Sequence, residues 1–148
     1  MPDAPTSGAM RGTTHVLPVR VYYEDTDFTG VVYHAGYLRF FERGRTDFLR
    51  LAGVHHQELW SRTDPLAFTV RTLTIDYLSP AHVDDALLVE TRFEAIKGAA
   101  IDINQLLTRD GEALAKAAVK AVVVNGAGKP RRPPDDVRQA LARYVPAP

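Results

Sequence analysis

The chain has 148 residues, of which 45% are hydrophobic and 24% charged, and this length and composition predict a single globular domain. Its 18 lysines and arginines balance 18 aspartates and glutamates, so the overall charge gives no reason to expect nucleic acid or an anionic membrane as a partner. It has no cysteine and no apolar run approaching the roughly 18 residues of a membrane span, which excludes disulfides, thiolate metal sites, cysteine nucleophiles and spanning helices. We therefore expect a cytoplasmic protein whose chemistry comes from oxygen and imidazole side chains or from the backbone.

The first elements are a disordered lead, a strand and a long helix. Residues 1–14 are rich in Pro, Gly, Ser and Thr and show no hydrophobic period, so we expect them to be disordered and to precede a domain over residues 15–128. From Val16 to Tyr23 the composition is typical of a first strand. Residues 35–52 then favour a helix that is buried on one side, because apolar residues and a glycine recur at steps of three and four. This predicted stripe consists of Tyr37, Leu38, Phe41, Gly44, Phe48, Leu51 and Ala52.

The other side of this helix is charged, which predicts a solvent-facing surface. Its residues are Arg39, Glu42, Arg43, Asp47 and Arg50. Gly44 lies on the apolar side, where a glycine costs about 1 kcal/mol relative to alanine. We expect the compensation to be close approach to another backbone, as when a helix lies against a sheet. Gly53 is expected to end the helix, and residues 55–62 predict a short second one.

After Asp64-Pro65 the hydrophobic period becomes two, which predicts four successive strands. Lys97-Gly98 and Asp110-Gly111 predict tight hairpin turns between the last three of them. The alternation slips near Arg71, so we expect a bulge or a change of burial there. Residues 129–148 read as a C-terminal linker followed by a short helix. The whole pattern predicts an α+β domain with one antiparallel sheet and one long central helix.

The predicted sheet has open edges and strands rich in valine. Such edges commonly pair with a second copy of the same chain. We therefore expect a homo-oligomer.

The densest chemistry lies between the first strand and the long helix. Residues 22–34 contain three carboxylates, a histidine and three tyrosines. The helix is expected to begin near His34 or Ala35, and a helix start presents free N–H groups and the positive end of a dipole, which can receive an oxyanion. Asp27 lies one short loop upstream, where it could attack a carbonyl carbon directly or deprotonate a water that does so.

Three other interpretations of the same segment compete with catalysis. Asp25 or Asp27 could instead cap the first turn of the helix, which is the commonest role of an aspartate in this place. A calcium loop fails, because its twelfth position falls on Gly36 where a bidentate glutamate is required. A metal site built from Asp25, Asp27 and His34 lacks a diagnostic spacing, so we predict no metal.

The run VRVYYEDTDFTGVVYHAGYLRFFERGRTDFL resembles the opening of the hotdog-fold acyl-CoA thioesterases of the 4-hydroxybenzoyl-CoA thioesterase family. It is most similar to the YbgC-like branch of that family, which is associated with the Tol-Pal system. The similarity continues through FTVRTLTIDYLSPAHVDDALLVET and covers about residues 16–128. It implies a helix wrapped by an antiparallel sheet, a homodimer or homotetramer, and hydrolysis of acyl-CoA in a cleft between subunits, with no cofactor.

The resemblance also assigns roles to individual residues. It implies that Asp27 is the catalytic carboxylate, that the backbone N–H of His34 polarises the thioester carbonyl, and that Gly30 lets the loop between them bend. The role of the His34 imidazole stays open. Tyr23, Tyr33 and Glu42 match family positions and are candidates for substrate binding, with packing or surface pairing as the alternative for each.

Two other functions remain compatible with these residues. One is a non-catalytic adaptor that binds acyl-CoA, acyl-carrier proteins or envelope-system proteins. The other is a dehydratase or hydratase, because that chemistry pairs a histidine such as His34 with a carboxylate. The chain departs from the near branch at Phe28-Thr29, where relatives often have smaller residues, so the acyl specificity is expected to differ.

Overall fold

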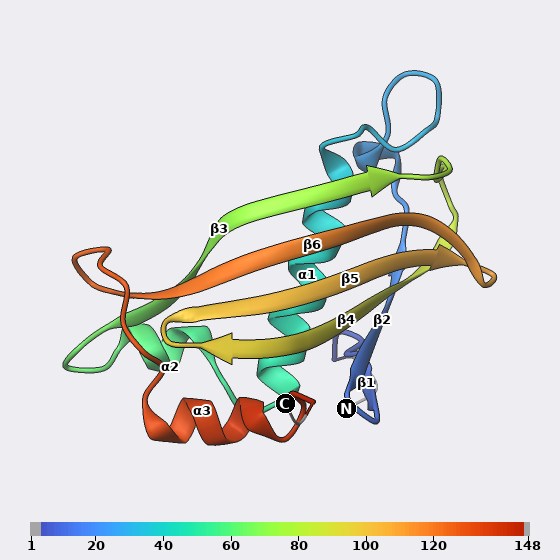
Figure 1. The fold of residues 1–148 in the computed structure, drawn as a ribbon. Helices are drawn as coiled ribbons and strands as arrows, with labels where there is room; N and C mark the ends of the chain where they lie inside the picture. Colours follow the sequence, from blue (N-terminus) through green and yellow to red (C-terminus); the bar gives the residue numbers. More distant parts are fainter. Residues whose placement is uncertain (1–3, 147–148) are drawn as a thin grey trace.

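A computed structural model describes residues 4–146 of the chain, which fold into one curved sheet around a long helix (Figure 1). The strands form a six-stranded sheet in the order β1-β2-β4-β5-β6-β3, in which every neighbouring pair is antiparallel. The predicted α+β class is therefore confirmed. The elements, in chain order, are β1 (Ala9–Arg11), β2 (Thr14–Arg20), the 3₁₀ turn η1 (Tyr23–Asp25), α1 (Gly36–Leu51), α2 (His56–Trp60), β3 (Leu66–Tyr77), β4 (Ala86–Lys97), β5 (Ala100–Arg109), β6 (Glu112–Asn125) and α3 (Asp135–Ala142).

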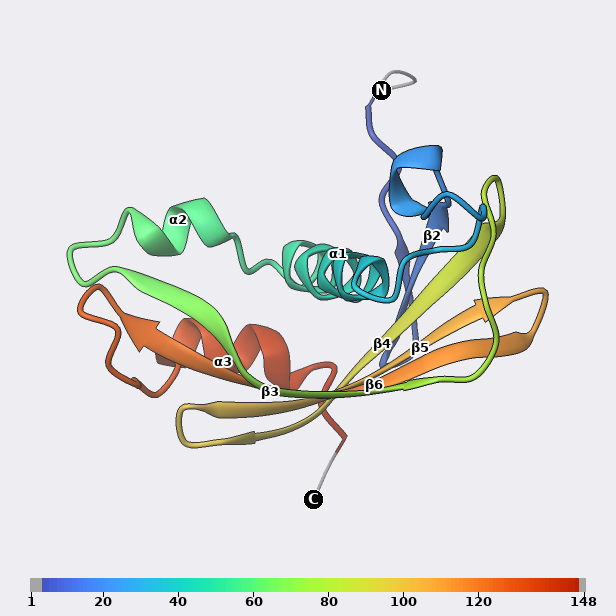
Figure 2. The same cartoon turned by 90° about the horizontal axis from the view of Figure 1, so that it is seen from above.

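Helix α1 lies in the hollow of the sheet, as Figure 2 shows. A Cβ atom added to Gly44 would lie 2.7 Å from Val89 Cγ1 and 2.8 Å from Thr91 Oγ1. The close approach expected at Gly44 is therefore real, although the nearest atoms belong to side chains of β4 and not to backbone. The ring of Phe48 stacks on that of Phe93 with centroids 4.1 Å apart. The buried residues of α1 are Tyr37, Phe40, Phe41, Gly44, Asp47, Phe48 and Leu49.

The predicted buried stripe of α1 is wrong at three positions. Leu38 and Leu51 are exposed, at 39% and 38%. Asp47, which we expected on the solvent side, is 3% exposed. It is buried because its carboxylate accepts hydrogen bonds from Gly8 N–H at 2.8 Å and from His15 Nε2 at 2.7 Å, and it also pairs with Arg50.

The N-terminal segment differs from the prediction of a disordered lead over residues 1–14. Ala9–Arg11 forms the edge strand β1, which pairs with the start of β2 around a turn in which Gly12 has φ +65°. The hydrogen bond from Gly8 to Asp47 fixes this segment to α1. The first strand itself, expected over Val16–Tyr23, is displaced toward the N-terminus. Residues 1–3 lie outside the described part of the chain.

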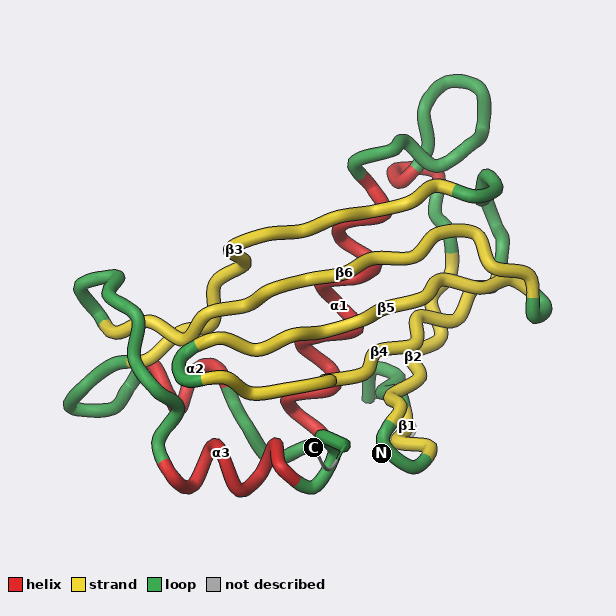
Figure 3. Tube along the Cα trace, viewed as in Figure 1, coloured by secondary structure: helices red, strands yellow, loops and turns green. Residues whose placement is uncertain are grey.

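The four strands predicted after Pro65 are all present, and both hairpins turn where expected (Figure 3). Gly98 has φ +62° in the first turn, and Asp110 and Gly111 have φ +50° and +83° in the second, as a type I′ turn requires. The register of β3 against β6 shifts between Val70 and Thr72, which confirms the bulge predicted at Arg71. The outer edge of β3 pairs with no other strand in residues 4–146.

The C-terminal helix expected after the linker is also present. Val137 and Leu141 of α3 are buried in the same core as α1, and Tyr144 packs edge-on against Phe48. Within the described residues, no helix is long and apolar enough to cross a membrane.

Candidate active site

The segment between β2 and α1 folds into a tight loop beside the start of α1. Thr26 and Val32 form a bridge across the loop, and Asp27 N–H donates to the Val31 carbonyl at 2.9 Å. Gly30 N–H returns to the Asp27 carbonyl at 3.2 Å, and Gly30 has φ +85°. This left-handed conformation favours glycine, so Gly30 allows the bend that was expected of it. In Figure 1 the loop projects beyond the N-terminal end of α1.

Asp27 carries the loop's accessible carboxylate. Its Oδ1 accepts hydrogen bonds from Thr29 Oγ1 at 2.6 Å and Thr29 N–H at 2.7 Å. These bonds stabilise the charged form, and the Thr29 hydroxyl is the main cause of a lowered pKa for Asp27. The carboxylate is therefore ionised at neutral pH. No hydrogen bond to Oδ2 occurs within the described chain.

The alternative in which Asp25 or Asp27 caps α1 is wrong. Asp25 Oδ2 accepts from Tyr22 N–H at 2.8 Å, and this bond caps the turn η1. Asp27 binds Thr29, within its own loop. The N-cap residue of α1 is Ala35, whose side chain provides no hydrogen bond.

The start of α1 therefore presents free donors. In residues 4–146, neither His34 N–H nor Ala35 N–H donates to a protein acceptor. The first turn contains no acidic residue, so no carboxylate offsets the positive end of the helix dipole. The His34 carbonyl accepts a hydrogen bond from Tyr77 Oη at 2.7 Å. Free N–H groups at a helix start are suited to bind a carbonyl oxygen that becomes negative.

The loop over residues 79–85 supports the segment that carries Asp27. Val32 N–H donates to the Ala81 carbonyl at 2.8 Å, and Val83 N–H donates to the Gly30 carbonyl at 3.0 Å. The Asp85 carboxylate fixes this second loop internally, because its Oδ2 accepts from His82 N–H at 2.9 Å and from Arg109 Nη1 at 2.7 Å. Asp85 and Arg109 could not be found from the sequence, since no local pattern joins a loop residue to the end of β5, 24 residues away.

The structure gathers four of the six predicted site residues. Asp27, Gly30, Tyr33 and His34 belong to one short stretch, and the rings of Tyr33 and His34 lie 4.3 Å apart. Tyr23 lies on η1 and is 76% exposed. Glu42 is on the exposed side of α1, and no hydrogen bond or ion pair connects its side chain to the loop within residues 4–146.

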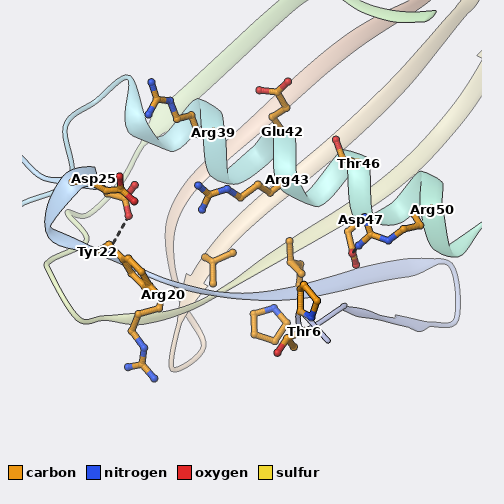
Figure 4. Close-up of a pocket in the computed structure, with 15 residues that line it drawn as sticks. Thr6, Arg20, Tyr22, Asp25, Arg39, Glu42, Arg43, Thr46, Asp47 and Arg50 are labelled. Carbon is orange, nitrogen blue, oxygen red and sulfur yellow. Dashed lines mark hydrogen bonds and ion pairs between the residues drawn. The ribbon is translucent and has the colours of Figure 1, made fainter. Parts of the chain in front are cut away.

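Two cavities flank α1, and neither is lined by Asp27 or His34. The larger, of about 830 Å³, lies between α1 and β2 and is lined by side chains of both charges, including Arg43 and Asp47 (Figure 4). The smaller, of about 80 Å³, lies on the β3 side of α1. Glu42 reaches both, and Arg45 enters only the smaller one, where burial lowers its pKa. Glu42 therefore borders a space near the free edge of the sheet, which Phe68 and Val70 of β3 also line.

A metal site is not formed by the acidic and histidine side chains of this region. Across residues 4–146, no group of three or more His, Asp or Glu side chains converges in a way that could hold a metal ion. The Asp25 carboxylate accepts from Tyr22 N–H, whereas that of Asp27 accepts from Thr29.

The sequence and the fold of this chain are similar to those of known thioesterases. A family model described as the thioesterase-like superfamily matches residues 21–141. The acyl-CoA thioesterase YbgC of Haemophilus influenzae is 51% identical over 126 residues, covering 84% of this chain and 92% of the relative. The acyl-CoA thioester hydrolase YbgC of Escherichia coli O6:H1 is 39% identical over 130 residues, covering 86% and 96%. The crystal structure of a probable thioesterase from Bartonella henselae, 42% identical, superposes with a TM-score of 0.79 over 82% of this chain and 99% of that one.

Proposed function

The chain belongs to the thioesterase-like superfamily, and on that basis we propose that it hydrolyses acyl-CoA thioesters with Asp27 as its catalytic carboxylate. Its hotdog fold, a single antiparallel sheet around α1, is that of the family. The observation that carries the assignment of the site is local: a half-buried carboxylate with a lowered pKa lies in the loop that leads into a helix start without a side-chain cap.

The reaction needs a polarised carbonyl and a group that delivers oxygen to it. In our proposal the thioester oxygen binds at the His34 N–H, where the negative charge that develops on this oxygen is stabilised. Asp27 acts in one of two ways. As a general base it takes a proton from water, whose oxygen bonds to the acyl carbon as the C–S bond breaks, and the CoA thiolate then receives the proton. As a nucleophile it forms an acyl anhydride and releases the thiolate, and water then hydrolyses the anhydride.

Thr29 supports either role. It binds Oδ1 of Asp27, which leaves Oδ2 available to the water or to the acyl carbon. The two Thr29 bonds also restrict rotation of the carboxylate, so that less entropy is lost when substrate binds. Phe28, 95% exposed at the loop tip, is free to contact an acyl group or pantetheine arm.

We also propose that the active form is a homodimer paired through β3. This strand is an unpaired edge, and Val70 and Tyr77 on it are 49% and 47% exposed. β3 runs from the small cavity at Phe68–Val70 to Tyr77, which contacts His34. A two-fold antiparallel pairing of β3 would place the Asp27 loop of one copy beside the cavity of the other. Glu42 would then border the bound substrate, as the resemblance implies.

The experiment is release of free CoA from a panel of short, long and aromatic acyl-CoA thioesters by wild type and by Asp27→Asn. We expect wild-type turnover of at least one thioester and loss of most of it in the variant. Asp135→Asn, an exposed change at the start of α3, is the matched control and should keep wild-type activity. Saturable acyl-CoA binding without release of CoA would support the adaptor instead, and water addition or loss on the same panel would support a hydratase.

A further inference from the structure

Tyr77, the last residue of β3, forms a hydrogen bond to the backbone just before the start of α1. Its Oη donates to the His34 carbonyl oxygen at 2.7 Å, which joins two elements separated by 43 residues in the chain. Within the described chain this carbonyl accepts no N–H from α1, because Leu38 N–H donates to the Ala35 carbonyl at 3.3 Å instead. The Tyr77 hydroxyl is thus the group that holds this carbonyl in position.

The peptide that Tyr77 holds also contains a free donor. The His34 carbonyl and the Ala35 N–H belong to one planar trans peptide, in which they point in opposite directions. Fixing the carbonyl therefore fixes the direction of the Ala35 N–H. This N–H donates to no protein acceptor in residues 4–146, and it is adjacent to the His34 N–H to which we assign the thioester oxygen.

The phenol of Tyr77 is itself held in place. Its ring packs edge-on against Tyr37 at 5.2 Å and 78°, and Tyr37 is 4% exposed. Tyr37 Oη accepts a hydrogen bond from Ala81 N–H at 3.0 Å, which connects the pair to the loop that supports Asp27. Desolvation raises the pKa of Tyr77, so the phenol remains protonated and can donate at neutral pH.

We propose that Tyr77 is a positioning residue for thioester hydrolysis, which orients the Ala35 N–H as a second donor to the thioester oxygen beside the His34 N–H. This inference rests on the proposed function. Tyr77 itself does not touch the reacting atoms, and its effect passes through the peptide that it holds. Two convergent donors bind a developing oxyanion better than one, and removal of a donor typically lowers kcat by roughly 10²–10³-fold. Loss of orientation alone leaves the donor present, so a smaller effect is expected.

The test is Tyr77→Phe, which removes only the hydroxyl and keeps the ring against Tyr37. We expect kcat to fall by about 10- to 100-fold, below the full effect of losing a donor, with KM within about twofold of wild type. Tyr144→Phe is the matched control, because the Tyr144 hydroxyl forms no hydrogen bond within the described chain and its ring packs against Phe48. Kinetics are compared at concentrations where light scattering gives the same mass for all variants.

Backbone amide NMR supplies a readout that does not depend on activity. In Tyr77→Phe the Ala35 amide signal should shift, because the peptide that carries it is no longer held, while the amide signals of α3 stay unchanged. Wild-type kcat in Tyr77→Phe, or an unchanged Ala35 amide signal, would overturn the inference while leaving the role of Asp27 intact. An inactive wild-type protein would instead remove the proposed function, and the Ala35 signal would still decide whether Tyr77 fixes this peptide.

Discussion

Replacing Gly44 by alanine tests how closely α1 approaches the sheet. The added Cβ would lie 2.7 Å from Val89 Cγ1, 2.8 Å from Thr91 Oγ1 and 3.1 Å from Gln105 Nε2. Val89 and Thr91 are both 0% exposed, and Thr91 Oγ1 accepts a hydrogen bond from Gln105 Nε2 at 2.9 Å. None of these atoms is the free end of a flexible side chain, so the helix or β4 must shift.

Two effects of opposite sign decide the result. Alanine gains about 1 kcal/mol over glycine as a helix residue, whereas overpacking a core typically costs about 1–3 kcal/mol. Because two contacts fall below 3.0 Å against buried atoms, we place the cost near the upper end, at about 3 kcal/mol. The net loss in free energy of unfolding is then about 2 kcal/mol, which corresponds to a decrease in Tm of roughly 4–8 °C for a chain of this size.

Urea unfolding of wild type and Gly44→Ala measures this loss directly, with the m-value as a check that the unfolded state is unchanged. The partner variant is Val89→Ala, which removes the nearest clashing methyl. In the double mutant the two changes should be less harmful together than their sum, by about 0.5–3 kcal/mol. A Gly44→Ala protein as stable as wild type would refute the claim that the helix contacts β4 this closely.

Three further predictions concern pH and the supporting ion pair. Burial lowers the pKa of His15 and of His56, so the unfolded chain binds more protons than the folded one below about pH 6.5, and the free energy of unfolding should fall as the pH falls through this range. Urea unfolding between pH 5 and 8 should show a flatter pH profile for His15→Gln than for wild type. An equally steep profile would count against burial of His15 as a cause. The side chains of Asp85 and Arg109 are 22% and 25% exposed, so Asp85→Asn, which weakens the ion pair between them, should lower the free energy of unfolding by about 1 kcal/mol, and Arg109→Gln by a similar amount. Strictly additive losses in the double mutant would contradict the pairing. The Thr29 hydroxyl lowers the pKa of Asp27, so kcat/KM should decline only at acidic pH, where Asp27 becomes protonated. Thr29→Val should move this decline to higher pH. A wild-type decline centred near neutral pH would implicate a different group.

The parts of the fold that were predicted correctly are those encoded by local patterns. The change from a helical period to a period of two located α1 and the four strands from β3 to β6, and turn chemistry located the hairpins at Gly98 and Asp110. The slip in alternation near Arg71 located the bulge, because a bulge moves every later side chain to the other face.

The errors concern residues whose environment depends on contacts far along the chain. Asp47 follows the charged periodicity of α1, yet it is buried because His15 and Gly8, 32 and 39 residues away, supply its hydrogen bonds. The same interaction accounts for the order of the N-terminal segment, whose composition alone favours disorder. Leu38 follows the apolar period of the helix, but it is 39% exposed at the start of α1.

The candidate site likewise combines residues that a local pattern predicts with residues that only long-range contacts bring together. Asp27, Gly30 and His34 are close in sequence, so a family motif was sufficient to propose them as site residues. Tyr77 and Arg109 reach this region from β3 and β5, and only the pairing of strands brings them there. Sequence therefore predicted the residues proposed to react, but not those that hold them.

The measurement that tests the central claim most directly is the ratio of kcat/KM for wild type and Asp27→Asn on the thioester that wild type hydrolyses fastest. The amide keeps the size of the side chain but removes its charge and its basicity, and unfolding in urea checks that stability is retained. We expect kcat/KM to fall by roughly 10²–10⁴-fold, the usual contribution of a general base, with Asp135→Asn unchanged. An Asp27→Asn protein that hydrolyses the thioester within a few-fold of the wild-type rate would contradict the assignment of Asp27 as the catalytic carboxylate.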